Sequence, residues 1–208
     1  PALLERLANL KPAEKQALGK IFTERIKSKD ILAYVEDRAL EGYLQSIGMG
    51  GEVFAPERAA SDDYLAVIHA NIAGGKTDAF MTEKINLKSV VDIRGAVVNT
   101  LEIERRHTGQ DQKEWWYRAA NKDYFQILTP AGARLLSASG HDRRLPDEPL
   151  RRPTYSTDPD VASIEGSRIW LPEFRLETLH QFGKNTFANW LTVAAGEKKM
   201  LKLEYENP

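Results

Sequence analysis

Cysteine is absent from all 208 residues of this chain. Its absence excludes a disulfide framework, a zinc site with cysteine ligands and a cysteine nucleophile. Long apolar runs are absent as well, since no stretch approaches the roughly 18 residues that a membrane-spanning helix requires. We therefore expect that this chain does not itself span a membrane.

An excess of either charge is also missing. The chain has 29 Lys and Arg residues against 30 Asp and Glu residues, for a formal net charge of -1. A protein whose main task is to neutralise phosphates carries a basic excess, so nucleic acid is not an expected partner. The hydrophobic content of 42% and the length suffice for a globular protein with a real core.

Most motifs of catalysis and metal binding are lacking. There is no Gly-x-Ser-x-Gly elbow, and no two of the four histidines stand at metal-ligand spacing. Asp158 and Asp160 offer oxygen ligands for calcium, but their spacing is not that of an EF-hand, and Pro159 more simply marks a turn. A carboxylate pair for glycoside hydrolysis is defined by distance in space, so the sequence leaves it open. We expect no catalytic residue, no metal and no cofactor.

The first fifty residues have a helical pattern. Apolar residues recur at helical spacing within 11–28, with Pro12 suited to a first turn. Asp37 is a candidate N-cap for a second helix that Gly48 closes. Residues 31–35, Ile-Leu-Ala-Tyr-Val, form a short strand candidate between the two helices.

After Tyr64 the apolar period changes from helical to two. In residues 84–93 and 97–106 apolar side chains alternate with polar ones, and Arg94-Gly95 makes a plausible hairpin turn between them. The sequence predicts strands at 64–72, 84–93, 97–106, 124–129, 133–137, 168–177, 186–194 and 198–206.

These patterns predict an α+β protein. Residues 1–60 would form a short helical segment with one strand, and residues 61–208 an antiparallel, immunoglobulin-like β-sandwich. Residues 139–166 contain four prolines and two Arg-Arg pairs, which predicts one long loop.

The stretch YLAVIHANIAGGKTD, residues 64–78, has an apolar run followed by Gly-Gly-Lys-Thr, as in a phosphate-binding loop. Such a loop needs a glycine where Ala70 stands and a helix that begins after the lysine. A period-two strand follows instead. We therefore expect a structural turn at Gly74, Gly75, Lys76 and Asp78, and no nucleotide site. If both glycines adopt positive φ, a valine at either should cost about 1 kcal/mol or more.

The segment HANIAGGKTD, residues 69–78, resembles the Asn-Ile-Ala-Gly-Gly-Lys-Thr-Asp signature of a bacterial domain-of-unknown-function family. Its members are large, exported cell-envelope proteins with an N-terminal membrane anchor. Further similar segments are 30–35 with the helix ending at Gly48, 99–103 with 106–109, and 183–208.

The resemblance covers nearly the whole chain and implies that it is the C-terminal part of a longer protein outside the cell membrane or in the cell wall. One departure is His69, where the family pattern has an acid, which puts any role of that acid in doubt. The family offers no established catalytic residues, so the resemblance implies location and architecture rather than chemistry.

Trp115, Trp116 and Tyr117 form the most unusual aromatic cluster and follow a polar loop. Aromatic faces can stack on sugar rings, although alternate members of the cluster could equally point into the core. We expect a non-enzymatic structural, adhesive or polymer-binding module, whose partner is envelope polysaccharide or another envelope protein. The alternative is an enzyme, or an accessory domain to one, that acts on envelope glycans.

Overall fold

The computed structural model describes residues 2–51, 53, 63–72, 75–93, 95–144, 156 and 158–208. The chain divides into two compact units, Pro1–Phe54 and Ala55–Pro208. The predicted boundary between residues 60 and 61 lies outside the described residues.

The first unit is helical, with α1 at Ala2–Ala8, α2 at Pro12–Lys27 and α3 at Arg38–Ser46. Pro12 opens α2, and the Asp37 side chain accepts a hydrogen bond from Leu40 N at 2.9 Å, so both predicted helix starts are confirmed. None of the described side chains of α2 or α3 is buried.

The strand predicted at residues 31–35 is wrong. Ala33 N donates to Met49 O, but Val35 N donates to the Glu41 side chain instead of to another strand. Without a neighbouring strand to pair with, an apolar run cannot form a β-ladder.

Among the described residues, no helix combines the length and the apolar character needed to cross a bilayer.

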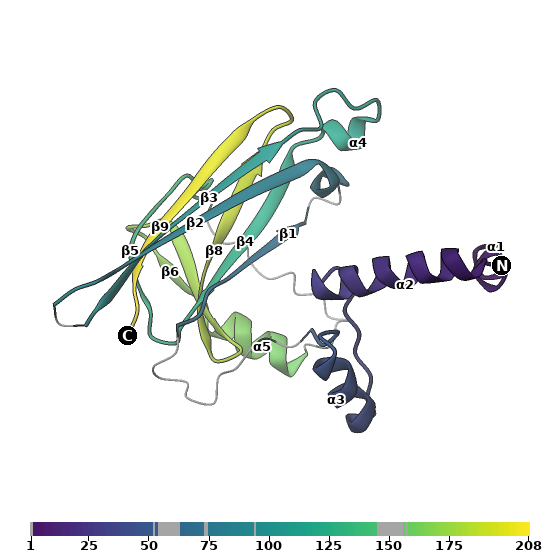
Figure 1. Cartoon of the computed structure of the whole chain (residues 1–208). Coiled ribbons are helices and arrows are strands. Elements are labelled where there is room, and N and C mark those ends of the chain that lie inside the picture. Colours follow the sequence, from purple (N-terminus) through teal and green to yellow (C-terminus); the bar gives the residue numbers. More distant parts are fainter. Residues whose placement is uncertain are drawn as a thin grey trace. The chain divides into compact units, whose positions relative to one another are not determined.

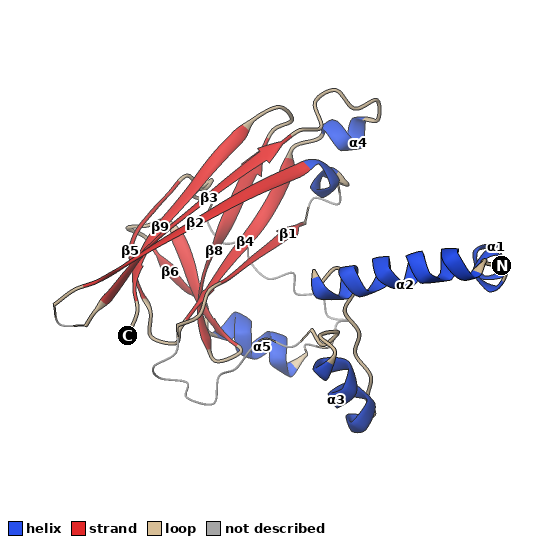
Figure 2. Ribbon diagram, viewed as in Figure 1, coloured by secondary structure: helices blue, strands red, loops and turns tan. Residues whose placement is uncertain are grey.

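The second unit consists mainly of two antiparallel sheets that face each other (Figures 1 and 2). The five-stranded sheet has the order β1 (Ala66–Asn71), β4 (Asn121–Thr129), β8 (Lys184–Val193), β7 (Leu176–Gln181), β6 (Ile169–Leu171). The four-stranded sheet has the order β2 (Met81–Val91), β3 (Val97–His107), β9 (Lys198–Glu206), β5 (Arg134–Ser139). The predicted α+β class with an antiparallel sandwich is confirmed at this level.

The core lies between the two sheets, where alternate side chains of β3, β4, β8 and β9 meet. On β3 the inward residues Leu101 and Ile103 are fully buried, while Glu102 and Glu104, which alternate with them, are not. Other buried members of this core are Phe125, Ile127, Phe187, Leu191, Leu201, Leu203 and Tyr205.

The predicted hairpin around Gly95 is confirmed, since β2 and β3 pair along their whole length from Met81–His107 to Val91–Val97. The two strands predicted at residues 124–129 and 133–137 do not pair as a hairpin. These strands, β4 and β5, belong to different sheets, so the turn at Pro130, Ala131 and Gly132 carries the chain across the sandwich.

Residues 139–166 are not one long loop. Within them α5 spans Pro159–Gly166, and Asp158 caps it by accepting hydrogen bonds from Asp160 N at 2.9 Å and Val161 N at 3.2 Å. Prolines suggested a loop, but Pro159 stands in the first turn, where a helix tolerates proline.

Candidate functional site

The three aromatic residues singled out in the sequence form one helical turn, α4 (Trp115–Arg118), just before β4. They do not alternate between core and surface as residues of a strand would. The Trp115 side chain is 69% exposed, whereas Trp116 and Tyr117 are partly buried. Edge-to-face contacts join the three rings in series, and Tyr117 packs against Phe80 at 4.9 Å between ring centres.

A buried histidine fixes the loop that carries α4. His107 Nδ1 accepts a hydrogen bond from Gly109 N at 3.0 Å, so its proton lies on Nε2, which donates to Ala119 O at 3.0 Å. A Cβ at Gly109 would lie 2.5 Å from Tyr117 O. Because Gly109 has no side chain, the two ends of this loop can approach so closely, and hydrogen bonds to His107 connect both ends.

The predicted structural turn is present but is built differently from the prediction. After β1, Thr77–Phe80 forms a single 3-10 turn, η1, that runs straight into β2. This turn lacks the α-helix that a phosphate loop requires. Gly75 does not adopt a positive φ, so the expected cost of a valine there loses its basis. Gly74 lies outside the described residues.

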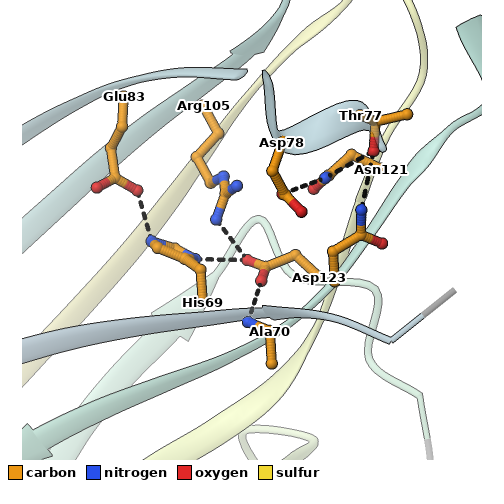
Figure 3. A network of polar contacts seen from close by, with 9 residues as sticks. His69, Ala70, Thr77, Asp78, Glu83, Arg105, Asn121 and Asp123 are labelled. Atoms are coloured by element: carbon orange, nitrogen blue, oxygen red, sulfur yellow. Dashed lines mark hydrogen bonds and ion pairs between the residues drawn. The ribbon is translucent and has the colours of Figure 1, made fainter. Parts of the chain in front are cut away.

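Polar side chains, not glycine conformation, hold this turn. The buried Thr77 hydroxyl accepts hydrogen bonds from the amides of Asn71 and Asn121, both at 3.0 Å. Asn121 Nδ2 also donates to Asp78 Oδ1 at 2.8 Å (Figure 3). The exposed Lys76 makes no hydrogen bond of this kind to any residue in the described part of the chain. Asn71 thus ties the β1–β2 connection to the end of β1, and Thr77 and Asp78 attach it to Asn121 of β4.

A group of four charged side chains, Glu83, His69, Asp123 and Arg105, bridges the two sheets next to this turn (Figure 3). His69 Nδ1 lies 2.6 Å from Asp123 Oδ2, and His69 Nε2 lies 2.5 Å from Glu83 Oε2. Arg105 Nη1 donates to Asp123 Oδ2 at 2.7 Å, and Ala70 N donates to Asp123 Oδ1 at 3.0 Å. We call this group the inter-sheet charge cluster.

The inter-sheet charge cluster is neutral when His69 is protonated, because two cations then face two carboxylates. Burial disfavours the imidazolium, but hydrogen bonds to Asp123 and Glu83 outweigh it and raise the pKa of His69 above its ordinary value. Burial likewise opposes ionisation of Glu83, but the hydrogen bond and charge of His69 outweigh it and lower the Glu83 pKa.

Sequence reasoning recognised only His69 of this cluster, and only as a departure from a pattern. A signal for two further members was present. Arg105 follows Leu101 and Ile103 at inward positions of one strand, and Asp123 precedes Phe125 at an inward position of another. A charged residue in phase with core residues indicates a buried partner of opposite charge.

The described residues contain no group of three His, Asp or Glu side chains arranged to hold a metal ion. Asp158, the candidate calcium ligand, uses its carboxylate to cap α5. His141 Nε2 lies 3.0 Å from Arg175 O and 3.1 Å from Phe174 O. These side chains have structural partners.

At one end of the sandwich, η1 and α4 bring together the signature turn, the inter-sheet charge cluster and an exposed indole.

In comparisons with protein-family models, with curated proteins and with solved structures, nothing matches this chain.

Proposed function

We propose that this chain is a non-enzymatic, extracellular module of a membrane-anchored bacterial envelope protein, and that it contacts an envelope polysaccharide through α4. The observation that carries the proposal is Trp115, a large apolar side chain 69% exposed on a turn that is held in place from beneath. The resemblance of residues 69–78 to the envelope family supports the location, and two antiparallel sheets with a chain crossing between them support an immunoglobulin-like sandwich.

An exposed indole on a hydrogen-bonded turn suits a polymer of sugars. The flat apolar face of a pyranose ring stacks on an aromatic face, and a backbone that is already fixed loses little entropy on binding. Trp116 supports Trp115 through an edge contact and is itself packed against Tyr117, and the hydrogen bond between Gly109 and His107 fixes the loop below. An exposed tryptophan without such support would have to be ordered by its ligand.

The test is binding of residues 1–208 to bacterial wall polysaccharide and to peptidoglycan in a sedimentation assay. Trp115→Ala should weaken binding at least about tenfold, as for a central aromatic contact. Phe182→Ala is the matched control, because Phe182 is 58% exposed on the β7–β8 turn at the opposite end of the sandwich. Binding that is undetectable, or equally weakened by both variants, would overturn the proposal.

The enzymatic alternative has its most specific support in the convergence of Glu83 and Asp123 on His69. A glycosidase, however, needs one carboxylic acid whose pKa is raised so that it can protonate the leaving group. The pKa of Glu83 is lowered, and the pair is neutralised by His69 and Arg105. We therefore prefer the non-enzymatic function. Release of reducing sugars by wild type and its abolition in Glu83→Gln would favour the alternative.

A further inference from the structure

A pocket of about 330 Å³ opens on the outer face of the five-stranded sheet, beside α5. Its volume is at the lower end of the ~300–1,000 Å³ typical of small-molecule sites, so it suits one ring rather than a chain. The outer face here is distinct from the core face and from α4. Its apolar walls are Ile72, Val161, Ile164 and Leu179.

The hollow results from the side chains that meet on this face. Ala188 of β8 lies between Gln126 of β4 and Glu177 of β7 in the ladder, so a small residue separates two long ones. The next row is formed by Tyr124 and Trp190, which are cross-strand partners with ring centres 5.5 Å apart. The small side chain of Ala188 thus leaves the depression, and the rings of Tyr124 and Trp190 bound it on one side.

Helix α5 forms the other side of the pocket and is tied to the sheet. His180 N of β7 donates to Ser167 Oγ at 2.8 Å, directly after α5. Val161 is 49% exposed and lines the pocket from the helix, so the opening lies along this helix. The pocket is therefore a built feature of the fold rather than a gap between independent parts.

Hydrogen-bonding groups converge on one wall. Glu177 is only 5% exposed, and the Tyr124 hydroxyl donates to its Oε1. Its Oε2 lies 3.2 Å from Arg168 Nε but accepts no hydrogen bond of good geometry within the described part of the chain. A buried carboxylate oxygen without a hydrogen bond calls for a donor, and a ligand hydroxyl is such a donor.

The charges of the lining define the class of ligand. Glu165 and Glu177 against Arg168 leave no positive excess to attract an anion, and Arg168 repels a cation that approaches Glu177. Glu177 and Gln126 accept hydrogen bonds and Arg168 donates them, while aromatic and aliphatic walls match C–H faces. We propose that this pocket binds a neutral, hydroxylated ring, such as the terminal sugar of a glycan.

The proposal is independent of polymer binding at α4 and is tested with small probes. Methyl β-glucoside, methyl β-galactoside and methyl N-acetyl-β-glucosaminide are titrated into the ¹⁵N-labelled chain, with choline and glucuronate as charged probes. At least one neutral probe should shift amides of β4, β7, β8 and α5, with a Kd on the order of 1 mM for so small a ligand.

Two variants and one control locate the site. Glu177→Gln keeps the shape but replaces the carboxylate, and it should weaken binding about tenfold. Val161→Trp fills the pocket from an exposed position and should abolish binding, whereas Ser163→Trp, on another exposed position of the same helix, should not.

Trp115→Ala should leave these shifts unchanged, which separates this site from the polymer contact. The inference is wrong if no neutral probe shifts these amides at about tenfold the expected Kd, if choline or glucuronate binds in preference, or if Val161→Trp and Ser163→Trp bind equally well.

Discussion

At the scale of single residues, the inter-sheet charge cluster is the least ordinary part of the molecule. Asp123 is 1% exposed and meets both His69 and Arg105, so its charge is buried but compensated. Removing one member of such a cluster leaves an uncompensated charge in a medium of low polarity, which is strongly destabilising. The cluster therefore links the pairing of the two sheets to the protonation of one imidazole.

Stability should fall as pH rises above neutrality, and His69→Gln should abolish most of this fall. The folded state raises the pKa of His69 above about 6.5, so its contribution is complete below that pH and is lost as pH rises through the folded pKa. Urea unfolding at several pH values between about 7 and 9 measures this slope.

Measurements above pH 7 avoid the contributions of Glu83 and His141 to the pH dependence of stability, which have the opposite sign to that of His69. The pKa of Glu83 is lowered, chiefly through His69 once burial is overcome, so its stabilisation is lost only as pH falls through the folded pKa. Burial lowers the pKa of His141, so protonation of this residue disfavours the folded state, and the free energy of unfolding again falls as pH falls. If the stability of His69→Gln fell with rising pH as steeply as that of wild type, His69 would not be the cause of this pH dependence.

A second residue-scale prediction concerns Gly140, which follows β5. Its φ is +89°, and a Cβ there would lie 1.9 Å from Met200 O, a backbone atom that cannot move aside. Gly140→Ala should cost about 3 kcal/mol or more in free energy of unfolding, because strain and overlap act together. Gly183→Ala is the control, since φ is +66° but nothing lies within 4 Å, so only the conformational cost of ~1–2 kcal/mol applies. Equal losses in the two variants would contradict this account.

At the scale of elements, alternation and caps predicted much of the structure, and side-chain chemistry at the turns predicted less. The β2–β3 hairpin and β9 follow the period-two pattern, and one face of β3 and of β9 meets the core, whereas β2 is exposed beyond Met81. Helix α5 was missed because four prolines outweighed the Asp158-Pro159 start signal. Arg105 and Asp123 escaped the prediction although each lies in phase with core residues of its strand, because alternation shows that a charge is buried but not which residue of another strand pairs with it.

The cap of α5 gives a prediction at this scale. Asp158→Ala removes acceptors for Asp160 N and Val161 N and should cost the helix about 1 kcal/mol. Amide hydrogen exchange should accelerate in α5 and leave β4 unchanged, since the helix lies outside the core. Ser163→Ala, in the same helix but away from the cap, should leave exchange in α5 slow. Equal acceleration in β4 would show that α5 unfolds only with the sandwich.

At the scale of the whole molecule, each sheet has a late strand in its interior. β8 lies between β4 and β7, and β9 lies between β3 and β5. Edge strands contribute one ladder of hydrogen bonds, whereas β8 and β9 each contribute two. The sandwich therefore depends on its last strands more than on its first.

Deleting residues 198–208 should abolish cooperative unfolding of the sandwich, because β3 and β5 lose the strand that joins them and Leu201, Leu203 and Tyr205 leave the core. Near-ultraviolet circular dichroism during a urea titration measures the transition. Deletion of residues 1–54 is the control and should preserve it, since the core lies wholly within Ala55–Pro208. A transition that survives the first deletion would contradict the dependence on β9.

The position of β9 also determines when the chain can fold. β3 pairs with its neighbour β2 on one side, but on the other side Val98 pairs with Glu206, about a hundred residues later in the sequence. As the chain is synthesised, β1 to β5 precede β8 and β9, so neither sheet is complete until these two strands have been made. Until then the apolar faces of the earlier strands lack part of the core that covers them, which leaves them open to association with other chains.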